Sequence, residues 1–259
     1  MNVDQRCLYW YCNQASNDTP PAFTAEDVAN ALKTVKPGTA PGYDNMHSKF
    51  LKHLGPKGLT WMARLFTRIA KKQRMPKLWR RAKVIALPKP GKDPQIPSSY
   101  RPISLLSVCF KLLERVVLQS CRADEILSGN QAGFRRGLST CDQVAALTTY
   151  IENGFQTNLK TGAIFLDLTA AYDTVWHTVF LCKLAKYMEP WFVHLIELLI
   201  RNRRFRVHMG DDISRWHIQA NGLPQGSVLA PTLFNLYTND LPTTFCRRFI
   251  YADNICCAV

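Results

Sequence analysis

The 259-residue chain is 47% hydrophobic, with 13 Gly and 15 Pro, which argues against a disordered protein and is typical of one or two packed domains. Its net charge is +14, and one segment without acids, between Asp44 and Asp93, carries as many positive charges by itself. These are Lys49, Lys52, Lys57, Arg64, Arg68, Lys71, Lys72, Arg74, Lys77, Arg80, Arg81, Lys83, Lys89 and Lys92. This concentration favours a nucleic-acid partner; the alternatives are a solvated helix face and a helix on a membrane surface.

The N-terminal half is predicted to be mostly helical. Residues 1–23 lack periodicity and are expected to be a lead-in segment. Thr24 and Asp27 form a capping-box pattern, which predicts a helix that ends before Pro37. Residues 36–44 form a Pro/Gly-rich loop, either a close approach to a phosphate chain or a plain connector. An apolar stripe over residues 59–70 then predicts a helix whose opposite face is basic.

Strands and helices alternate in the middle of the chain. Residues 81–88 have the composition of a strand, and Ser104 is predicted to cap a long helix that ends before Gly129. A polar, basic loop follows, and Thr140 begins another helix. The apolar run 162–168 predicts a buried strand that carries Asp167 near its end. Helices are expected after Asp173 and over residues 191–200.

Two hairpins are predicted in the last quarter. Residues 203–209 and 216–220 alternate apolar and polar residues around Gly210-Asp211-Asp212, which we interpret as a turn and not as a catalytic acid pair. A glycine-containing loop over 221–228 leads to a helix through Leu233, Leu236 and Leu241. The runs 249–252 and 255–259 form the second hairpin, with Asp253 and Asn254 at its tip. The order predicts an α+β fold, with helices on one face of an antiparallel sheet.

Asp167 and Asp253 are the candidate metal ligands. If their strands are neighbours, the two carboxylates converge, and paired carboxylates hold divalent cations well. The alternative is that Asp253 only forms a turn and Asp167 only caps one.

The cysteines and the termini indicate the compartment. Nine cysteines, an odd number without Cys-x-x-Cys spacing, argue for a reducing environment, and Cys7 with Cys12 is too loose a pattern for a zinc site. The N-terminus has no signal-peptide pattern, and the apolar run 191–200 is much shorter than a bilayer span. We therefore expect a soluble protein of the cytoplasm or nucleus, with no membrane association and no obligate protein partner.

Five motifs occur in an order and spacing that resemble the reverse transcriptases of non-LTR, LINE-type, jockey-like retrotransposons. They are residues 99–106 (SYRPISLL), 130–134 (NQAGF), 165–173 (FLDLTAAYD), 222–227 (GLPQGS) and 249–253 (FIYAD). The resemblance implies a right-hand polymerase: basic fingers over residues 24–160, mostly helical with a strand pair, and a partial, ferredoxin-like palm over residues 161–259. It also implies an RNA-directed DNA polymerase, a nucleotidyltransferase that uses deoxynucleoside triphosphates, a DNA primer and an RNA template.

The resemblance also implies a role for each site residue. Asp167 and Asp253 would hold two Mg²⁺ ions, with Mn²⁺ as an alternative, and Asn254 would be a weak or lost ligand. Tyr172 would lie beneath the incoming sugar, unless it is an ordinary buried tyrosine. Gln225 and Gly226 would contact the nucleotide or template. Arg101, which could equally make a structural ion pair, would neutralise the triphosphate with Lys83 and Lys89. Template phosphates would contact Arg64, Arg68, Lys71, Lys72, Arg80, Arg81, Arg135 and Arg136.

Three departures from the family pattern argue for low activity. The family has two adjacent acids at the hairpin tip, whereas here the second is Asn254. No thumb segment is expected after the hairpin, and no endonuclease segment before the polymerase. The alternative function is therefore an inactive, truncated remnant that only binds nucleic acid.

Overall fold

The computed structural model describes residues 19–241 and 244–259. It divides into two compact units, each built from two stretches of the chain. Unit 1 contains the described part of Met1–Cys121 together with Trp176–Ala230, and unit 2 contains Arg122–Val175 and Pro231–Val259. The limits of the two units differ from the predicted boundary between fingers and palm, which lies between residues 160 and 161. The division into fingers and palm therefore stays a prediction. Most of the lead-in segment, with Cys7 and Cys12, lies outside the described residues.

Unit 1 contains a group of helices around an apolar core. They are α2 (Ala25–Lys33), α3 (Ser48–Lys52), α4 (Pro56–Lys72), α5 (Val108–Ser120), α8 (His177–Leu184) and α9 (Pro190–Ile200), with short 3₁₀ turns at Lys77–Arg80 and Pro97–Ser99. The capping box of Thr24 and Asp27 is present at the start of α2, as predicted. Phe66, Phe110 and Ile196 are fully buried, which anchors three of these helices in one core. Within the described residues, no helix is long and apolar enough to cross a membrane.

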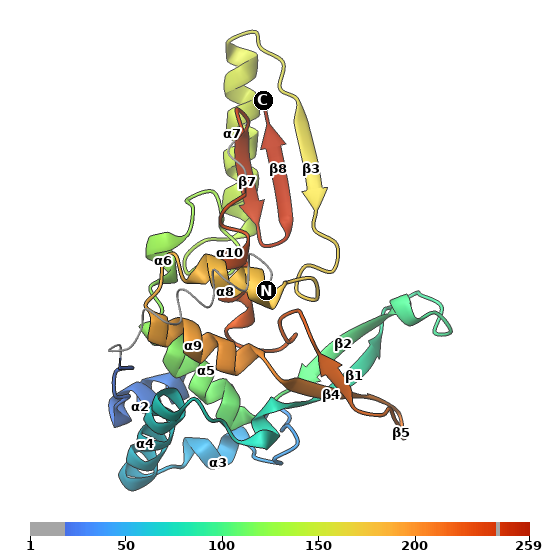
Figure 1. Ribbon diagram of the computed structural model, residues 1–259. Helices are drawn as coiled ribbons and strands as arrows, with labels where there is room; N and C mark the ends of the chain where they lie inside the picture. The colour runs from blue at the N-terminus through green and yellow to red at the C-terminus, as the bar shows by residue number, and fades with distance from the viewer. Residues whose placement is uncertain (1–18, 242–243) are drawn as a thin grey trace, which may run out of the picture. The chain divides into compact units, whose positions relative to one another are not determined.

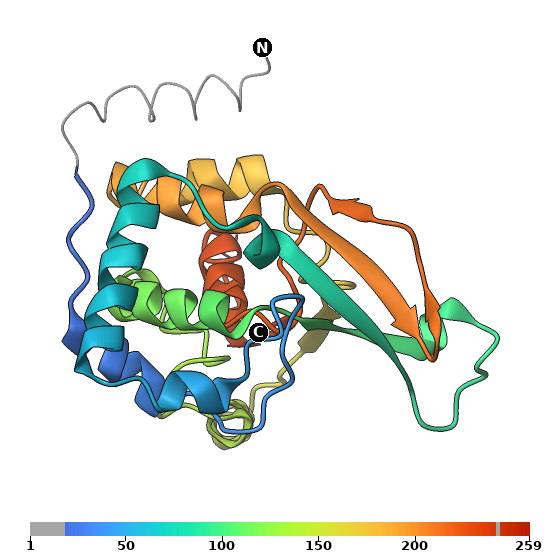
Figure 2. The same cartoon turned by 90° about the horizontal axis from the view of Figure 1, so that it is seen from below.

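A mixed sheet extends from these helices (Figure 2). Its strands are β1 (Arg81–Pro88), β2 (Tyr100–Leu105), β4 (Arg203–Met209), β5 (Asp212–Ile213) and β6 (His217–Gln219). β1 pairs antiparallel with β2 and parallel with β4, so this sheet is mixed. The predicted hairpin is confirmed: the chain turns at Gly210 after β4, and the returning strand pairs with β4 in two pieces, β5 and β6.

The predicted helix cap at Ser104 is wrong. Ser104 lies in β2, opposite Val84, and α5 begins at Val108; its N-cap is Ser107, which accepts a hydrogen bond from Phe110 N. Strand pairing prevails here because the β1–β2 register continues through Ser104 to Leu105, so the backbone of Ser104 is already extended and paired.

Unit 2 is a helix-covered antiparallel sheet of the kind predicted. Its elements are α6 (Ala123–Ile126), α7 (Thr140–Gln156), β3 (Ala163–Asp167), β7 (Arg247–Tyr251), β8 (Asn254–Ala258) and α10 (Ala230–Tyr237), which begins at the unit boundary. The strand order is β3-β8-β7, and α7 lies along the sheet (Figure 1). Leu147 and Tyr150 of α7 pack against Phe249, Cys256 and Ala258.

β3 is not the buried strand that its apolar sequence predicts. Ile164 is 64% exposed and Phe165 72% exposed. The reason is its place in the sheet: β3 is an edge strand, whereas α7 packs over β7 and β8.

Candidate active site

The last hairpin presents Asp253 in a two-residue loop. Tyr251 pairs with Asn254 across β7 and β8, so the loop is Ala252-Asp253, one residue earlier than predicted, and Asn254 is the first residue of β8. Ala252 has φ +56°, in the left-handed region that is costly for a residue with a Cβ. Asp253 is therefore held on a tight and specifically shaped turn.

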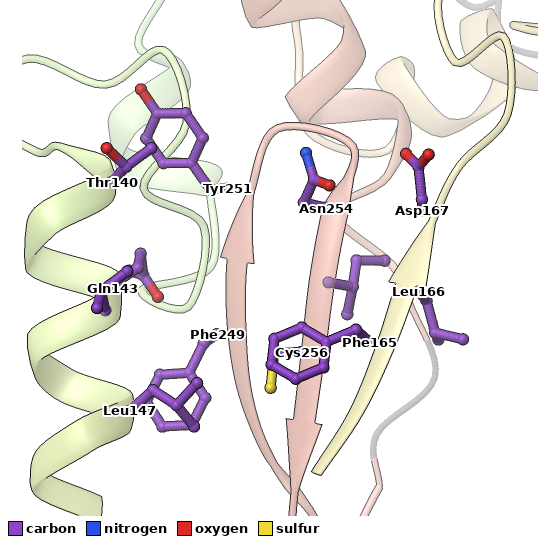
Figure 3. Close-up of a pocket in the computed structure, with 12 residues that line it drawn as sticks. Thr140, Gln143, Leu147, Phe165, Leu166, Asp167, Phe249, Tyr251, Asn254 and Cys256 are labelled. Atoms are coloured by element: carbon purple, nitrogen blue, oxygen red, sulfur yellow. The ribbon is translucent and has the colours of Figure 1, made fainter.

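The two carboxylates come from neighbouring strands. β3 pairs antiparallel with β8, and Asp167 lies opposite Asn254 in the register. Leu168 N donates to Asp253 O at 3.1 Å, which joins the end of β3 directly to the hairpin loop. Figure 3 shows the side chains of Asp167 and Asn254 at the same end of the two strands. The expected adjacency of the two strands is confirmed.

The donor set at this end of the sheet fits a hard divalent cation. Mg²⁺ in proteins is commonly held by one or two carboxylates and completes its shell with water and substrate phosphates. Asp167 is exposed and Asp253 half-buried, so both are open to such ligands. Asn254 Nδ2 donates to Asp253 Oδ1 at 3.4 Å. In the described residues, no group of three or more His, Cys, Asp or Glu side chains could hold a metal by itself.

Tyr172 lies in an aromatic group next to this acid. Its ring is stacked on Phe234 with centroids 5.3 Å apart, and the edge of Phe134 lies at 6.4 Å. Burial, and then the charge of Asp253, raise the pKa of Tyr172 to about 12. The tyrosine is therefore neutral at physiological pH, rigidly packed and close enough to Asp253 to sense its charge.

An apolar cavity of about 250 Å³ lies between α7 and the sheet, with Asp167 in its lining (Figure 3). Val144, Leu147, Phe165 and Ile255 form much of its lining, and Asp167 and Asn254 lie at one end.

The glycine-containing loop over residues 221–228 belongs to unit 1, where two elements hold it. Ser104 N of β2 donates to Gln225 O at 3.0 Å. Gly226 has φ +106°, and a Cβ there would lie 2.7 Å from Ser104 O. Only glycine allows this approach of the two backbones.

A buried carboxylate of α5 holds the other side of this loop. Glu114 is 2% exposed, accepts hydrogen bonds from Ser227 Oγ and from Val228 N at 3.0 Å, and has a pKa raised by burial. Burial lowers the pKa of Arg203 to about 10, against the opposing charge of Glu114. Arg203 Nη1 donates to Leu199 O at 3.1 Å and its guanidinium lies 4.7 Å from the centre of the Phe110 ring.

The other predicted nucleotide-binding residues are also in unit 1. Arg101 lies opposite Leu87, and Lys83 opposite Leu105, so both side chains belong to one face of the β1–β2 pair. Lys89 Nζ donates to Ser98 O at 2.9 Å and thereby closes the loop between the strands. This contact gives Lys89 a structural role whether or not it binds a phosphate.

The predicted nucleic-acid contacts divide into exposed and structural groups. Arg64, Arg68, Lys71 and Lys72 are exposed on α4, as is Arg136 in unit 2. Arg135, in contrast, forms a 3.1 Å ion pair with Asp124 and also donates to Ser128 O and Gln131 O.

Basic residues of β1 and β4 pack against the ring of Trp216, a cluster that the sequence did not indicate. Arg81 and Arg206 lie over the Trp216 ring, at 5.2 and 4.6 Å from its centre. Tyr43 packs against the same ring at 5.2 Å and contacts His208 Nε2 at 3.1 Å. Arg80 is half-buried beside β1, and its Nε has no hydrogen-bond partner among the described groups.

The structure thus brings together Asp167, Asp253, Asn254 and Tyr172 in unit 2. It places Gln225, Gly226, Arg101, Lys83 and Lys89 in unit 1. Glu114 and Gln131, which hold these segments, were missed as site residues. Gln131 stands within a recognised motif, but no local signal reveals partners that are more than 100 residues away.

Comparison with known proteins identifies the family. Residues 87–259 match the family model described as reverse transcriptase (RNA-dependent DNA polymerase). The chain is 35% identical over 84% of its length to a probable RNA-directed DNA polymerase from transposon BS of Drosophila melanogaster, of which it covers 24%. It is 32% identical over 85% of its length to the RNA-directed DNA polymerase from mobile element jockey of Drosophila funebris, again covering 24%. The chain spans about a quarter of these relatives, and it belongs to the reverse transcriptase family.

Proposed function

We propose that the chain is the RNA-directed DNA polymerase domain of a non-LTR retrotransposon, and that it joins a deoxynucleotide to a primer 3′-hydroxyl on an RNA template. The observation that carries the proposal is the junction of β3 with the hairpin loop, which supports a role for Asp167 and Asp253 as a carboxylate pair. Family membership and the names of the relatives support it.

Asp167 and Asp253 would hold two Mg²⁺ ions, or Mn²⁺ in their place. When bound, such ions lower the pKa of the attacking hydroxyl and neutralise charge on the transferred and leaving phosphates. Asn254 would supply at most a neutral oxygen. Replacing a charged ligand by an amide weakens both metal binding and charge stabilisation, so the site would work more slowly than one with a second acid.

The remaining residues would bind and orient the substrates. Tyr172, fixed against Phe234, would exclude a 2′-hydroxyl by occupying its space. Gln225, on a loop held from two sides, would contact the nucleotide or the template, and Arg101 with Lys83 would neutralise the triphosphate. Their preorganisation is what positioning catalysis requires, because phosphoryl transfer depends on geometry and charge more than on covalent chemistry.

The exposed cations of α4 and the Arg81–Trp216–Arg206 cluster would bind the nucleic-acid strands. Basic side chains contact phosphates, and Trp216 would hold the guanidinium groups of Arg81 and Arg206 in place for such contacts.

The test is primer extension on a primed RNA template with Mg²⁺, with template binding measured in parallel. Asp167→Ala should abolish extension and leave binding nearly unchanged, whereas Asp211→Ala, at an exposed turn, should change neither. An equal loss of extension and binding in Asp167→Ala would contradict a catalytic role.

Asn254→Asp tests the effect of the missing acid. A restored ligand that stabilises the transition state by about 3 kcal/mol should raise the extension rate about a hundredfold. If neither the wild-type chain nor Asn254→Asp extends a primer while both bind template, the polymerase proposal fails and a nucleic-acid-binding remnant is the better description.

A further inference from the structure

Residues 130–133, which carry no role in the proposal above, run alongside the strand that leads to Asp253. Ile250 N donates to Asn130 O at 3.0 Å, and Ala132 N donates to Ile250 O at 2.9 Å. Gln131 thereby forms a parallel bridge with Ile250, on the edge of β7 that does not face β8. This places the side chain of Gln131 beside the hairpin loop.

The Gln131 amide satisfies both backbone groups of Ala252. Its Oε1 accepts from Ala252 N at 2.9 Å and from Gly133 N at 2.8 Å, and its Nε2 donates to Ala252 O at 3.2 Å. Two N–H donors and one carbonyl acceptor fix which end of the amide carries the oxygen. Gln131 is 4% exposed, so water does not compete for these bonds.

The residue held in this way is strained and lies next to the acid. Ala252 has φ +56°, and its left-handed conformation persists only where the surroundings stabilise it. Because Asp253 follows immediately, the backbone angles of Ala252 determine where the Asp253 carboxylate is directed.

The support behind Gln131 is itself rigid. A Cβ on Gly133 would lie 2.2 Å from Ala252 N, so only glycine lets this segment approach the hairpin. Gly133 O accepts from Asn235 Nδ2 at 2.7 Å, and Asn235, on α10, is 2% exposed. The clamp therefore connects α10, the 130–133 segment and the catalytic hairpin within unit 2.

We propose that Gln131 is a positioning residue that sets the metal affinity of the Asp167–Asp253 pair by fixing the conformation of Ala252. The inference rests on the proposed function, because it presumes that Asp253 is a metal ligand. The two loop residues would then be held from opposite sides: Ala252 by the Gln131 amide, and Asp253 by Leu168 N. Loss of the amide would leave both backbone groups of Ala252 unsatisfied and free the loop to relax.

The experiment measures Mn²⁺ binding to the full chain by electron paramagnetic resonance, together with the thermal melting temperature. Gln131→Leu should weaken Mn²⁺ binding about tenfold, because the net free energy of roughly one hydrogen bond no longer holds Asp253 in its binding position. Gln156→Leu, the same change at an exposed position on α7, is the matched control and should bind as the wild type does. Wild-type affinity in a folded Gln131→Leu variant overturns the proposal.

A second variant covers a failure of Gln131→Leu to fold. Gln131→Glu keeps the size and the accepting oxygen but removes the donor that faces Ala252 O, and in its folded form it should also weaken Mn²⁺ binding, with a melting temperature lowered by the unsatisfied buried groups. A drop in melting temperature with undiminished affinity would show a purely structural residue and overturn the proposal.

The failure of the metal site itself is recognised separately. If the Asp253→Ala variant binds Mn²⁺ as tightly as the wild type does, Asp253 is not a metal ligand and the proposed function loses its metal site. The positioning role is then decided by amide exchange of Ala252: about tenfold faster exchange in Gln131→Leu, with Ile250 still protected, supports the clamp. Unchanged protection of Ala252 overturns it.

Discussion

Glu114 offers the sharpest test of how unit 1 holds the Gln225 loop. The change to alanine removes a buried acceptor of two hydrogen bonds, from Ser227 Oγ and Val228 N, and leaves the buried Arg203 without its nearby negative charge. The Glu114 carboxylate binds the loop to α5 and its charge acts on Arg203 of β4, so one substitution perturbs all three segments.

The magnitude follows from two overlapping terms. A hydrogen bond to a charged group contributes about 1.5–3 kcal/mol, and breaking one side of a buried charge pair costs about 3–5 kcal/mol. Both terms describe the loss of the same carboxylate, so they are not added. We expect Glu114→Ala to lower the free energy of unfolding of unit 1 by about 4 kcal/mol, a large part of the 5–15 kcal/mol typical of a domain.

Urea unfolding followed by tryptophan fluorescence measures the loss of stability of unit 1. The tryptophans of the described residues all lie in unit 1, at positions 61, 79, 176, 191 and 216. The control is Glu197→Ala, which removes a partly exposed 2.8 Å ion pair with Arg201 and should cost about 0.3–0.5 kcal/mol.

A double substitution separates charge from packing. Glu114→Leu with Arg203→Met removes both charges, so it should destabilise unit 1 less than Glu114→Leu alone. A loss below about 1 kcal/mol in Glu114→Ala, or additive losses in the double variant, would refute the reasoning.

Three further predictions follow from the same geometry. Gly226→Ala should unfold or displace the loop and abolish extension, since its Cβ would lie 2.7 Å from a backbone oxygen, whereas Gly55→Ala meets nothing within 4 Å and should be silent in the same assay. His177 has a pKa lowered first by burial, so the unfolded chain binds its proton more readily, and urea unfolding should show stability falling as the pH drops below about 6.5; His177→Asn should flatten that slope, and an unchanged slope would contradict the assignment. Tyr172→Ala should raise ribonucleotide incorporation at least about tenfold relative to deoxynucleotides, and unchanged selectivity would show that the ring does not exclude the 2′-hydroxyl.

Local signals predicted most of the elements. The capping box at Thr24 and the alternation around Gly210 each lie within a few residues, and the structure confirms both. The Ser104 prediction failed because a serine before an apolar run satisfies the helix-start pattern equally at 104 and at 107. Only the pairing of β2 with β1, a contact between distant residues, decides between them.

The candidate site was predictable where a motif carries its own chemistry. Asp167 and Asp253 could be named because carboxylates at strand ends indicate metal binding, and their strands are indeed neighbours. Glu114 and Gln131 could not be found in this way. An acid within an amphipathic helix and an amide within a loop have many ordinary uses, and their partners at 227 and 252 are visible only after folding.

The exposed edge of β3 has a consequence for the behaviour of the protein in solution. An edge strand offers unpaired backbone N–H and C=O groups, and here the uncharged, apolar residues Ile164, Phe165 and Leu166 accompany them. Such a segment is a template for strand addition by a second chain. Concentrated samples should therefore self-associate through this edge, and a single lysine at position 164, outside the cavity lining, should keep the chains apart.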